Sequence, residues 1–175
     1  MFEQGDSALP SEVARLIDQP QYCTDADIAV DKTLIRAMCA VVQNSNPVFW
    51  SSEVAESIVG KQVAPSSLLA AWGRPELWEP ERRHSIRALQ LHFDLKDLFG
   101  YPASLVASFE TVFYAPAVIG EVLNTRQVLK TVSDVASTHL GIGRYWTIEM
   151  QYRNPSAQLV GIDIYNFFAY SKEQP

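Results

Sequence analysis

The sequence has few of the features that mark several large classes of protein. Its 175 residues include two cysteines, Cys23 and Cys39, and three scattered histidines, His84, His92 and His139. No Cys-x-x-Cys or His-Glu-x-x-His spacing occurs, so neither a disulfide framework nor a zinc site is predicted. No apolar run reaches the roughly 18–20 residues that span a bilayer, and a membrane partner is not expected.

Clustered positive charge is also missing. The formal net charge is −6, from 14 Lys and Arg against 20 Asp and Glu. Nucleic-acid phosphates need a clustered basic surface, so a nucleic-acid partner is not expected, whereas a phosphorylated small molecule needs only a few local cations. The polar, acidic start MFEQGDSALP lacks the basic and apolar regions of a secretory signal, which favours the cytoplasm.

The chain does contain enough apolar material for one domain, with 47% hydrophobic residues. Helical patterns fill its first half. Residues 11–18 predict a short helix capped by Ser11, and residues 31–42, DKTLIRAMCAVV, predict a stronger one capped by Asp31. The second helix is expected to end near Asn44 to Pro47, because the residue before a proline disfavours the α region.

Three further helices are predicted. Residues 51–60, SSEVAESIVG, run from a serine cap to a glycine that suits a helix end. Residues 64–72, APSSLLAAW, with Ser66 or Ser67 as cap, have no polar face, and a helix that is apolar all round belongs inside a protein. Residues 85–100 predict a helix that ends at Gly100.

The second half of the chain is typical of strands. Residues 104–114, 120–132, 144–154 and 157–170 are rich in Val, Ile, Thr and aromatic residues. Alternation places Trp146, Ile148, Met150 and Tyr152 on one face. The NPSAQ stretch at 154–158 predicts a hairpin, and residues 115–120 and 133–143 predict turns or loops. The predicted class is α+β, an antiparallel sheet wrapped around one buried helix.

The order of these segments resembles the MaoC-like hot-dog hydratases and dehydratases, in particular the branch with an N-terminal fatty-acid-synthase-like dehydratase domain. The resemblance runs from about Asp31 to Tyr170, and its anchors are NSNPVFW, VAPSSLLAAW, ASFETVFYAPAVIGEVL and YWTIEMQYRNPSAQLVGIDIYNFFAY. It implies a single hot-dog domain over residues 31–171, preceded by a segment with a short helix (1–30) and followed by a tail (172–175).

Enzymes of this family add water to the double bond of a 2-enoyl thioester, or remove it. In their Gly-Asp-x-Asn-Pro-x-His pattern the Asp and His are the acid/base pair, and N–H groups at the start of the hot-dog helix receive the thioester oxygen. Here Asn46 and Pro47 match, but Gln43 stands at the glycine, Asn44 at the Asp and Phe49 at the His. The resemblance implies an active-site elbow without its acid/base groups; a plain helix-ending Asn-Pro turn is the alternative.

Family members work as pairs of hot-dog domains, of which often only one keeps the Asp and His. Residues 73–117 resemble the non-catalytic partner in heteromeric hydratases that act on steroid side-chain CoA thioesters, and the chain's end soon after Tyr170 fits one such half. The resemblance implies a hetero-oligomer with a catalytic MaoC-like subunit, an acyl-CoA substrate, and no cofactor beyond the CoA that the substrate carries. The rivals are a homodimeric acyl-thioester-binding protein without catalysis, and a self-sufficient hydratase or thioesterase with a relocated base.

Each candidate residue also has a purely structural interpretation. The candidate substrate-binding residues are Asn46, Pro47, Phe49, Ser66 and Trp72. Ser66 either offers its N–H to a thioester or only caps a helix, and Trp72, like Trp78, either walls an acyl tunnel or packs in the core. Phe49 and Trp50 are candidates to fill the space of the lost pair, with the tunnel expected near Phe49 and Trp72.

The charged candidates are similarly divided. The cations Arg126, Lys130, Arg144 and Arg153 either meet CoA phosphates or lie on solvated strand faces. The three histidines either replace the lost base or are packed or surface residues. For the partner, residues 107–114 and 120–132 are candidate strands for sheet-to-sheet pairing, because an unpaired edge strand needs covering.

Overall fold

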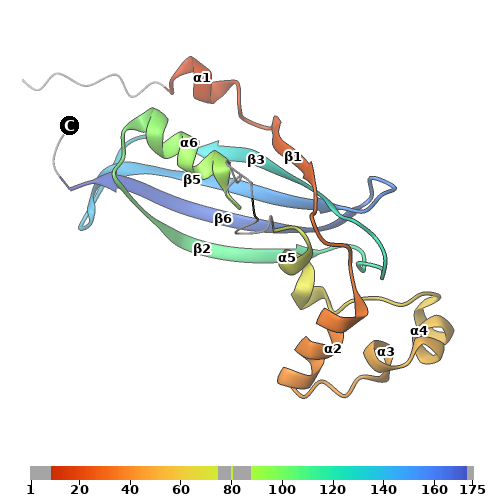
Figure 1. Ribbon diagram of the computed structural model, residues 1–175. Coiled ribbons are helices and arrows are strands. Elements are labelled where there is room, and N and C mark those ends of the chain that lie inside the picture. The colour runs from red at the N-terminus through yellow and green to blue at the C-terminus, as the bar shows by residue number, and fades with distance from the viewer. Residues whose placement is uncertain (1–8, 75–79, 81–87, 173–175) are drawn as a thin grey trace, which may run out of the picture.

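The computed structural model describes residues 9–74, 80 and 88–172. Six antiparallel strands form one sheet in the order β1-β3-β5-β6-β2, with β4 pairing beside β5. The strands are β1 (Pro20–Asp25), β2 (Ala103–Phe113), β3 (Asn124–Val132), β4 (Ala136–Thr138), β5 (Gly141–Arg153) and β6 (Leu159–Ser171). The helices are α1 (Ser11–Ala14), α2 (Lys32–Val41), α3 (Pro47–Trp50), α4 (Ser52–Val59), the 3-10 turn η1 (Ser66–Leu68), α5 (Leu69–Trp72) and α6 (Gln90–Phe99). Figure 1 shows α5 and α6 on one face of the sheet, with α2, α3 and α4 grouped beyond one end.

The long hairpin of β5 and β6 forms as the alternation predicts. Trp146, Ile148, Met150 and Tyr152 are all buried on the face that the helices cover, hereafter the inner face. At the tip of the hairpin the side-chain oxygen of Asn154 accepts hydrogen bonds from the N–H groups of residues 156 and 158, at 3.1 and 3.0 Å. An asparagine that binds the backbone two residues on is a common way to fix a turn.

Two short helices cover the inner face: the predicted buried helix at 64–72 is shorter than expected, and the helix predicted at 85–100 forms as α6, with Gly100 at its C-cap. The segment after Pro65 makes a 3-10 turn and a four-residue helix, α5, and α6 then lies on the same face (Figure 1). The cap predicted at Ser66 or Ser67 is wrong: Pro65 is at the N-cap and no side chain caps the turn. Because Pro65 takes the N-cap position, both serines lie within the first turn, too late to cap it.

The core consists of two adjoining clusters on the inner face. One surrounds α5 and includes Leu69, Trp72 and Tyr152; the other surrounds α6 and includes Leu91 and Trp146. The chain after α5 approaches the sheet so closely that a Cβ atom on Gly73 would lie 2.3 Å from the ring of Tyr152. Ala70 and Ala71 are only half-buried, so α5 is not buried on all sides.

The predicted helix caps beyond one end of the sheet are confirmed. The Asp31 carboxylate accepts hydrogen bonds from the N–H groups of residues 33 and 34 at the start of α2. The Ser51 hydroxyl caps α4, which ends at Gly60 with a φ of 75°. In α2, Ile35 and Cys39 are buried, whereas Val41 at its last position is 84% exposed.

Two strands were missed by the sequence analysis. β1 lies before Asp31, the expected start of the domain, and pairs with β3. Within the expected loop at 133–143, β4 pairs with the start of β5. The expected helix at 11–18 is shorter, ending at Ala14, and Pro10 rather than Ser11 is at its N-cap. In the part of the chain that the structure describes, no helix is long and apolar enough to cross a membrane.

Candidate functional site

The stretch that resembles the active-site elbow forms a closed turn between α2 and α3. Gln43 has a positive φ of 53°, and the N–H of Asn44 donates to the carbonyl of Cys39 at 2.8 Å. The Asn44 side-chain oxygen accepts from the N–H of Asn46 at 3.0 Å, and the Asn46 side-chain oxygen accepts from the N–H of Val48 at 3.1 Å. The two asparagine side chains therefore hold the backbone of the elbow.

The acid/base positions of the elbow carry no titratable group. Asn44 is half-buried, and its amide stays neutral near pH 7. Phe49 is half-buried and packs against the cluster that contains Trp72. Beside Phe49, between α3 and the segment before Ser66, the remaining hollow measures about 10 Å³. A water molecule needs at least about 10–15 Å³, so this side of the elbow is nearly filled.

A wider hollow of about 380 Å³ opens on the other side of the elbow. Its lining residues are Cys39, Ala40, Gln43, Asn44, Ser45, Pro47 and Trp50. The lining contains amides, a thiol and apolar groups, but no carboxylate and no imidazole. It therefore offers a shaped surface without an acid/base pair.

The other candidate substrate-binding residues, Ser66 and Trp72, lie in the 3-10 turn η1 and in α5. The segment before Ser66 shares the small hollow with Phe49 through Gln62 and Val63. Ser66 is exposed at the start of the 3-10 turn, where the first N–H groups have no acceptor within the helix. Trp72 is 1% exposed within the core, and its indole N–H has no hydrogen-bond partner among the described residues.

Among the histidines, His92 is held as a neutral core residue. Its Nδ1 accepts a hydrogen bond from the Trp146 indole at 3.2 Å, so the proton is on Nε2, which faces the Ser104 hydroxyl at 3.0 Å. The ring stacks on Phe167 at 3.8 Å between centroids. Burial, with a smaller effect of the Lys96 charge, lowers the pKa of His92 to about 4. An imidazole with both nitrogens occupied in this way is poorly placed to accept a proton from water.

The remaining sequence candidates are far from a catalytic arrangement. His139 is exposed beside β4, while His84 and Trp78 lie outside the described residues. Lys130 pairs with Asp18, and Arg144 is buried over the ring of Phe99. Among residues 9–74, 80 and 88–172, no cluster of His, Cys, Asp or Glu could hold a metal ion.

One buried carboxylate escaped the sequence analysis. Asp163 on β6 is 1% exposed on the inner face, and it accepts hydrogen bonds from Tyr152 at 2.7 Å and Thr111 at 2.6 Å. Burial first, and then the charge of Asp163, raise the pKa of the Tyr152 hydroxyl. The signal in the sequence was an acidic residue on the apolar face of GIDIYNFF. Since each oxygen of Asp163 is already bound, the carboxylate organises the inner face near the β2 edge.

The strand β2 forms an open edge of the sheet. It pairs with β6 on one side, and no described strand pairs with its other side. Several large apolar side chains are exposed along it, namely Leu105, Val106, Phe109 and Phe113, and Tyr114 directly after it is exposed as well. Of the two strands proposed for partner pairing, 107–114 therefore lies at an edge, whereas β3 from the other segment lies between β1 and β5.

Comparisons with known proteins agree with this architecture. No family model matches the chain. It is 25% identical over 163 residues to a probable enoyl-CoA hydratase alpha subunit of Thermomonospora curvata. The aligned residues cover 90% of this chain and 49% of that relative. The chain thus spans about half the length of the curated relative that it matches.

Solved structures show the same fold at lower identity. A chain of the ChsH1-ChsH2 complex from Mycobacterium tuberculosis superposes with a TM-score of 0.71 at 18% identity, over 93% of this chain and 91% of that one. The MaoC-like dehydratase from Rhodospirillum rubrum superposes with a TM-score of 0.58 at 14% identity, over 90% and 94%. The sheet, the inner helices and the elbow define an α+β hot-dog fold. It is the form of that fold seen in MaoC-like dehydratases.

Proposed function

We propose that this chain is the non-catalytic subunit of a heteromeric 2-enoyl-CoA hydratase. A catalytic MaoC-like hot-dog subunit supplies the Asp and His, and this chain shapes one wall of the acyl-CoA tunnel. The substrates are acyl-CoA thioesters with bulky acyl groups, such as steroid side chains. The working compartment is the cytoplasm.

The observation that carries the proposal is an intact elbow without acid/base groups. Asn44 and Asn46 bind backbone N–H groups, and Phe49 packs into the core, so the turn keeps its shape while its chemistry is missing. A hydratase must transfer a proton to or from water, which neither an amide nor a phenyl ring does near neutral pH. The partner must therefore bring the pair.

The open β2 edge supports a partnership through the sheet. An exposed strand with free N–H and C=O groups and apolar side chains favours pairing with another strand. Val106 and Phe109 lie on it at 50% and 54% exposure. The likeness to a chain of a ChsH1-ChsH2 complex favours a different hot-dog chain as the partner over a second copy.

The test is to express this chain alone and with each hot-dog protein encoded beside it, then to assay hydration of enoyl-CoA thioesters that differ in acyl bulk. We expect no turnover by the unmixed chain and turnover by one complex. Phe109→Lys is expected to release the partner, because it puts a charge on the pairing edge, while Tyr145→Lys serves as the control. Tyr145 is 40% exposed on β5, away from that edge.

Other outcomes would select a rival. Steady turnover by the unmixed, mass-verified chain would establish a relocated base. A stable homodimer that binds acyl-CoA but leaves every hot-dog neighbour unbound would establish a binding protein without catalysis.

A further inference from the structure

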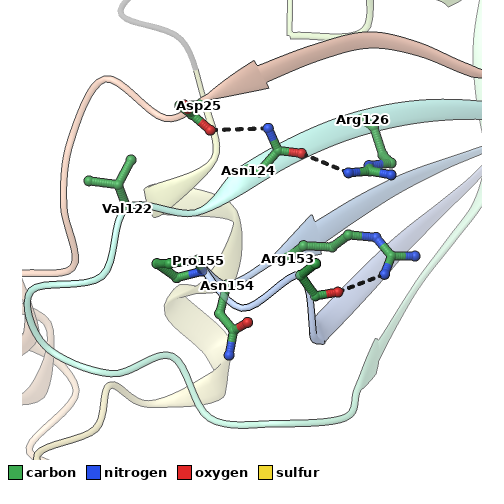
Figure 2. Close-up of a pocket in the computed structure, with 8 residues that line it drawn as sticks. Asp25, Val122, Asn124, Arg126, Arg153, Asn154 and Pro155 are labelled. Atoms are coloured by element: carbon green, nitrogen blue, oxygen red, sulfur yellow. Dashed lines mark hydrogen bonds between the residues drawn. The ribbon is translucent and has the colours of Figure 1, made fainter.

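Two arginines meet in one hollow on the outer face of the sheet. Arg126 on β3 opposes Gln151 on β5, and Arg153 lies two residues further along β5. Side chains on such a diagonal share a face, with Cα atoms about 7–8 Å apart. Both line a hollow of about 430 Å³ (Figure 2), a volume typical of small-molecule sites.

Neutral groups hold both guanidinium groups in position. Arg126 donates to the side-chain oxygen of Asn124 at 3.1 Å. Arg153 donates to the carbonyl of Ala157 at 2.9 Å and to the side-chain oxygen of Gln151 at 3.3 Å. Amide and carbonyl oxygens orient a guanidinium without cancelling its charge.

The positive charge of the pair is offset through amides and not by direct contact with a carboxylate: Gln151, which accepts from Arg153, donates to the Glu149 carboxylate at 2.9 Å. Within the described parts of the chain, neither Arg126 nor Arg153 forms an ion pair with a carboxylate, and the Nε of each is buried without a partner. Asp25 is the acidic residue of the lining, and Asn124 stands between it and Arg126, donating to its carboxylate at 3.1 Å (Figure 2). Two neighbouring cations raise each other's energy, and a bound anion would lower it.

The other cations on the strands, Lys130 and Arg144, are already bound by groups of this chain. Lys130 is paired with Asp18, and the Arg144 guanidinium donates to the carbonyl of Ser133 and lies over Phe99. The chain has a net charge of −6, whereas the lining of this hollow contains two arginines and one aspartate and is therefore locally positive. Pro155 and the exposed Val122 add apolar surface to it.

We propose that this hollow binds a phosphate group of a nucleotide, namely the phosphorylated adenosine end of the CoA thioester. Guanidinium groups match phosphate oxygens with paired N–H donors, which makes arginine suited to this ligand. The identity of the ligand rests on the proposed function, but anion binding by the two arginines does not. The site would anchor the substrate by its nucleotide, apart from the elbow.

The experiment is calorimetric titration of the purified chain with adenosine 3′,5′-bisphosphate, adenosine and inorganic phosphate. We expect the bisphosphate to bind, adenosine to bind at least about tenfold more weakly, and binding to weaken with salt. Arg126→Gln and Arg153→Gln are each expected to raise Kd about tenfold or more, since each removes charge-assisted hydrogen bonds. Asp25→Asn is expected to lower Kd.

The controls separate a local site from general charge. Arg15→Gln removes an exposed charge at the end of α1, at the other end of the sheet from the hollow, and should leave Kd unchanged (Figure 1). Arg153→Gln also removes the hydrogen bond that Arg153 donates to the carbonyl of Ala157 in the hairpin. Arg153→Lys removes the guanidinium but keeps the positive charge, so it should bind the bisphosphate more tightly than Arg153→Gln. Unchanged Kd in the folded Arg126→Gln/Arg153→Gln double variant would overturn the inference.

Two results keep this inference distinct from the proposed function. Arginine-dependent bisphosphate binding together with inactive complexes would leave the site standing and remove the hydratase role. Active complexes with no arginine-dependent binding would support the hydratase role and remove the anion site. Equal affinity for inorganic phosphate and the bisphosphate would overturn the nucleotide as the ligand and identify the hollow as a site for free phosphate.

Discussion

The Leu69 side chain packs directly over Gly161. A Cβ atom on Gly161 would lie 2.4 Å from Cδ2 of Leu69 and 2.9 Å from the carbonyl oxygen of Val112. Because Gly161 has no side chain, α5 can approach β6 this closely on the inner face. Because the start of α5 follows the turn at Ser66, this contact also fixes where that turn lies.

Gly161→Ala is expected to destabilise the fold by about 1–3 kcal/mol, as overpacking of a core does. Part of that cost should vanish when Leu69 is also truncated, because the double variant removes the clashing methyl group. Chemical denaturation of both single variants and the double variant measures this coupling. Strictly additive losses would contradict the contact.

Leu69→Ala alone should lower the free energy of unfolding by about 2–5 kcal/mol, since Leu69 is 3% exposed. Leu98→Ala on α6 is the matched control, because Leu98 is 49% exposed and its truncation should cost under about 0.5 kcal/mol. Equal losses at the two positions would place α5 away from the core and argue against the hot-dog arrangement.

Asn44 is expected to matter as an acceptor rather than as a catalytic group. Asn44→Ala removes the hydrogen bond to the N–H of Asn46 and should cost about 0.5–1.5 kcal/mol. Asn44→Asp keeps an acceptor, so it should stay close to the parent in thermal denaturation and give no hydratase activity in the unmixed chain. Turnover by Asn44→Asp alone would show that the elbow retains more catalytic capacity than its geometry indicates.

His92 should make stability depend on pH. Its pKa is about 4 in the folded chain against 6.5 for an unperturbed histidine, so the unfolded chain binds more protons between those values. The free energy of unfolding should therefore rise as pH increases from 4 to 6.5 and gain nothing further from this group above that range. His92→Gln should reduce the slope, as denaturation curves at several pH values would reveal; an unchanged slope in the folded variant would contradict this assignment.

The sequence predicted best where local signals and burial agreed. The alternation from Trp146 to Tyr152, the Asn154 turn, and the caps at Asp31 and Ser51 depend on neighbouring residues, and all four appear in the structure. The turn before Pro47 also forms between α2 and α3, where the Asn-Pro pair predicted the end of a helix.

What the sequence could not supply depends on distant partners. β1 was missed because PQYCTD has weak alternation and gains its pairing from β3, a hundred residues later. The helix over 64–72 shortened because Pro65 took the cap position and the 3-10 turn followed. Asp163 and the pair Arg126 and Arg153 acquire their meaning only from cross-strand neighbours, which periodicity along one strand does not reveal.

The two edges of the sheet differ in a way that limits how many chains can join. The β2 edge is long and apolar, but the β1 edge begins with Pro20, has an irregular register between Gln21 and Thr24, and bends at Tyr22, whose φ is 50°. Proline and bulges prevent strand addition. If the proposed partner pairs through β2, the irregular β1 edge disfavours a second neighbour, so growth through the sheet would stop at a pair and would not continue into a filament.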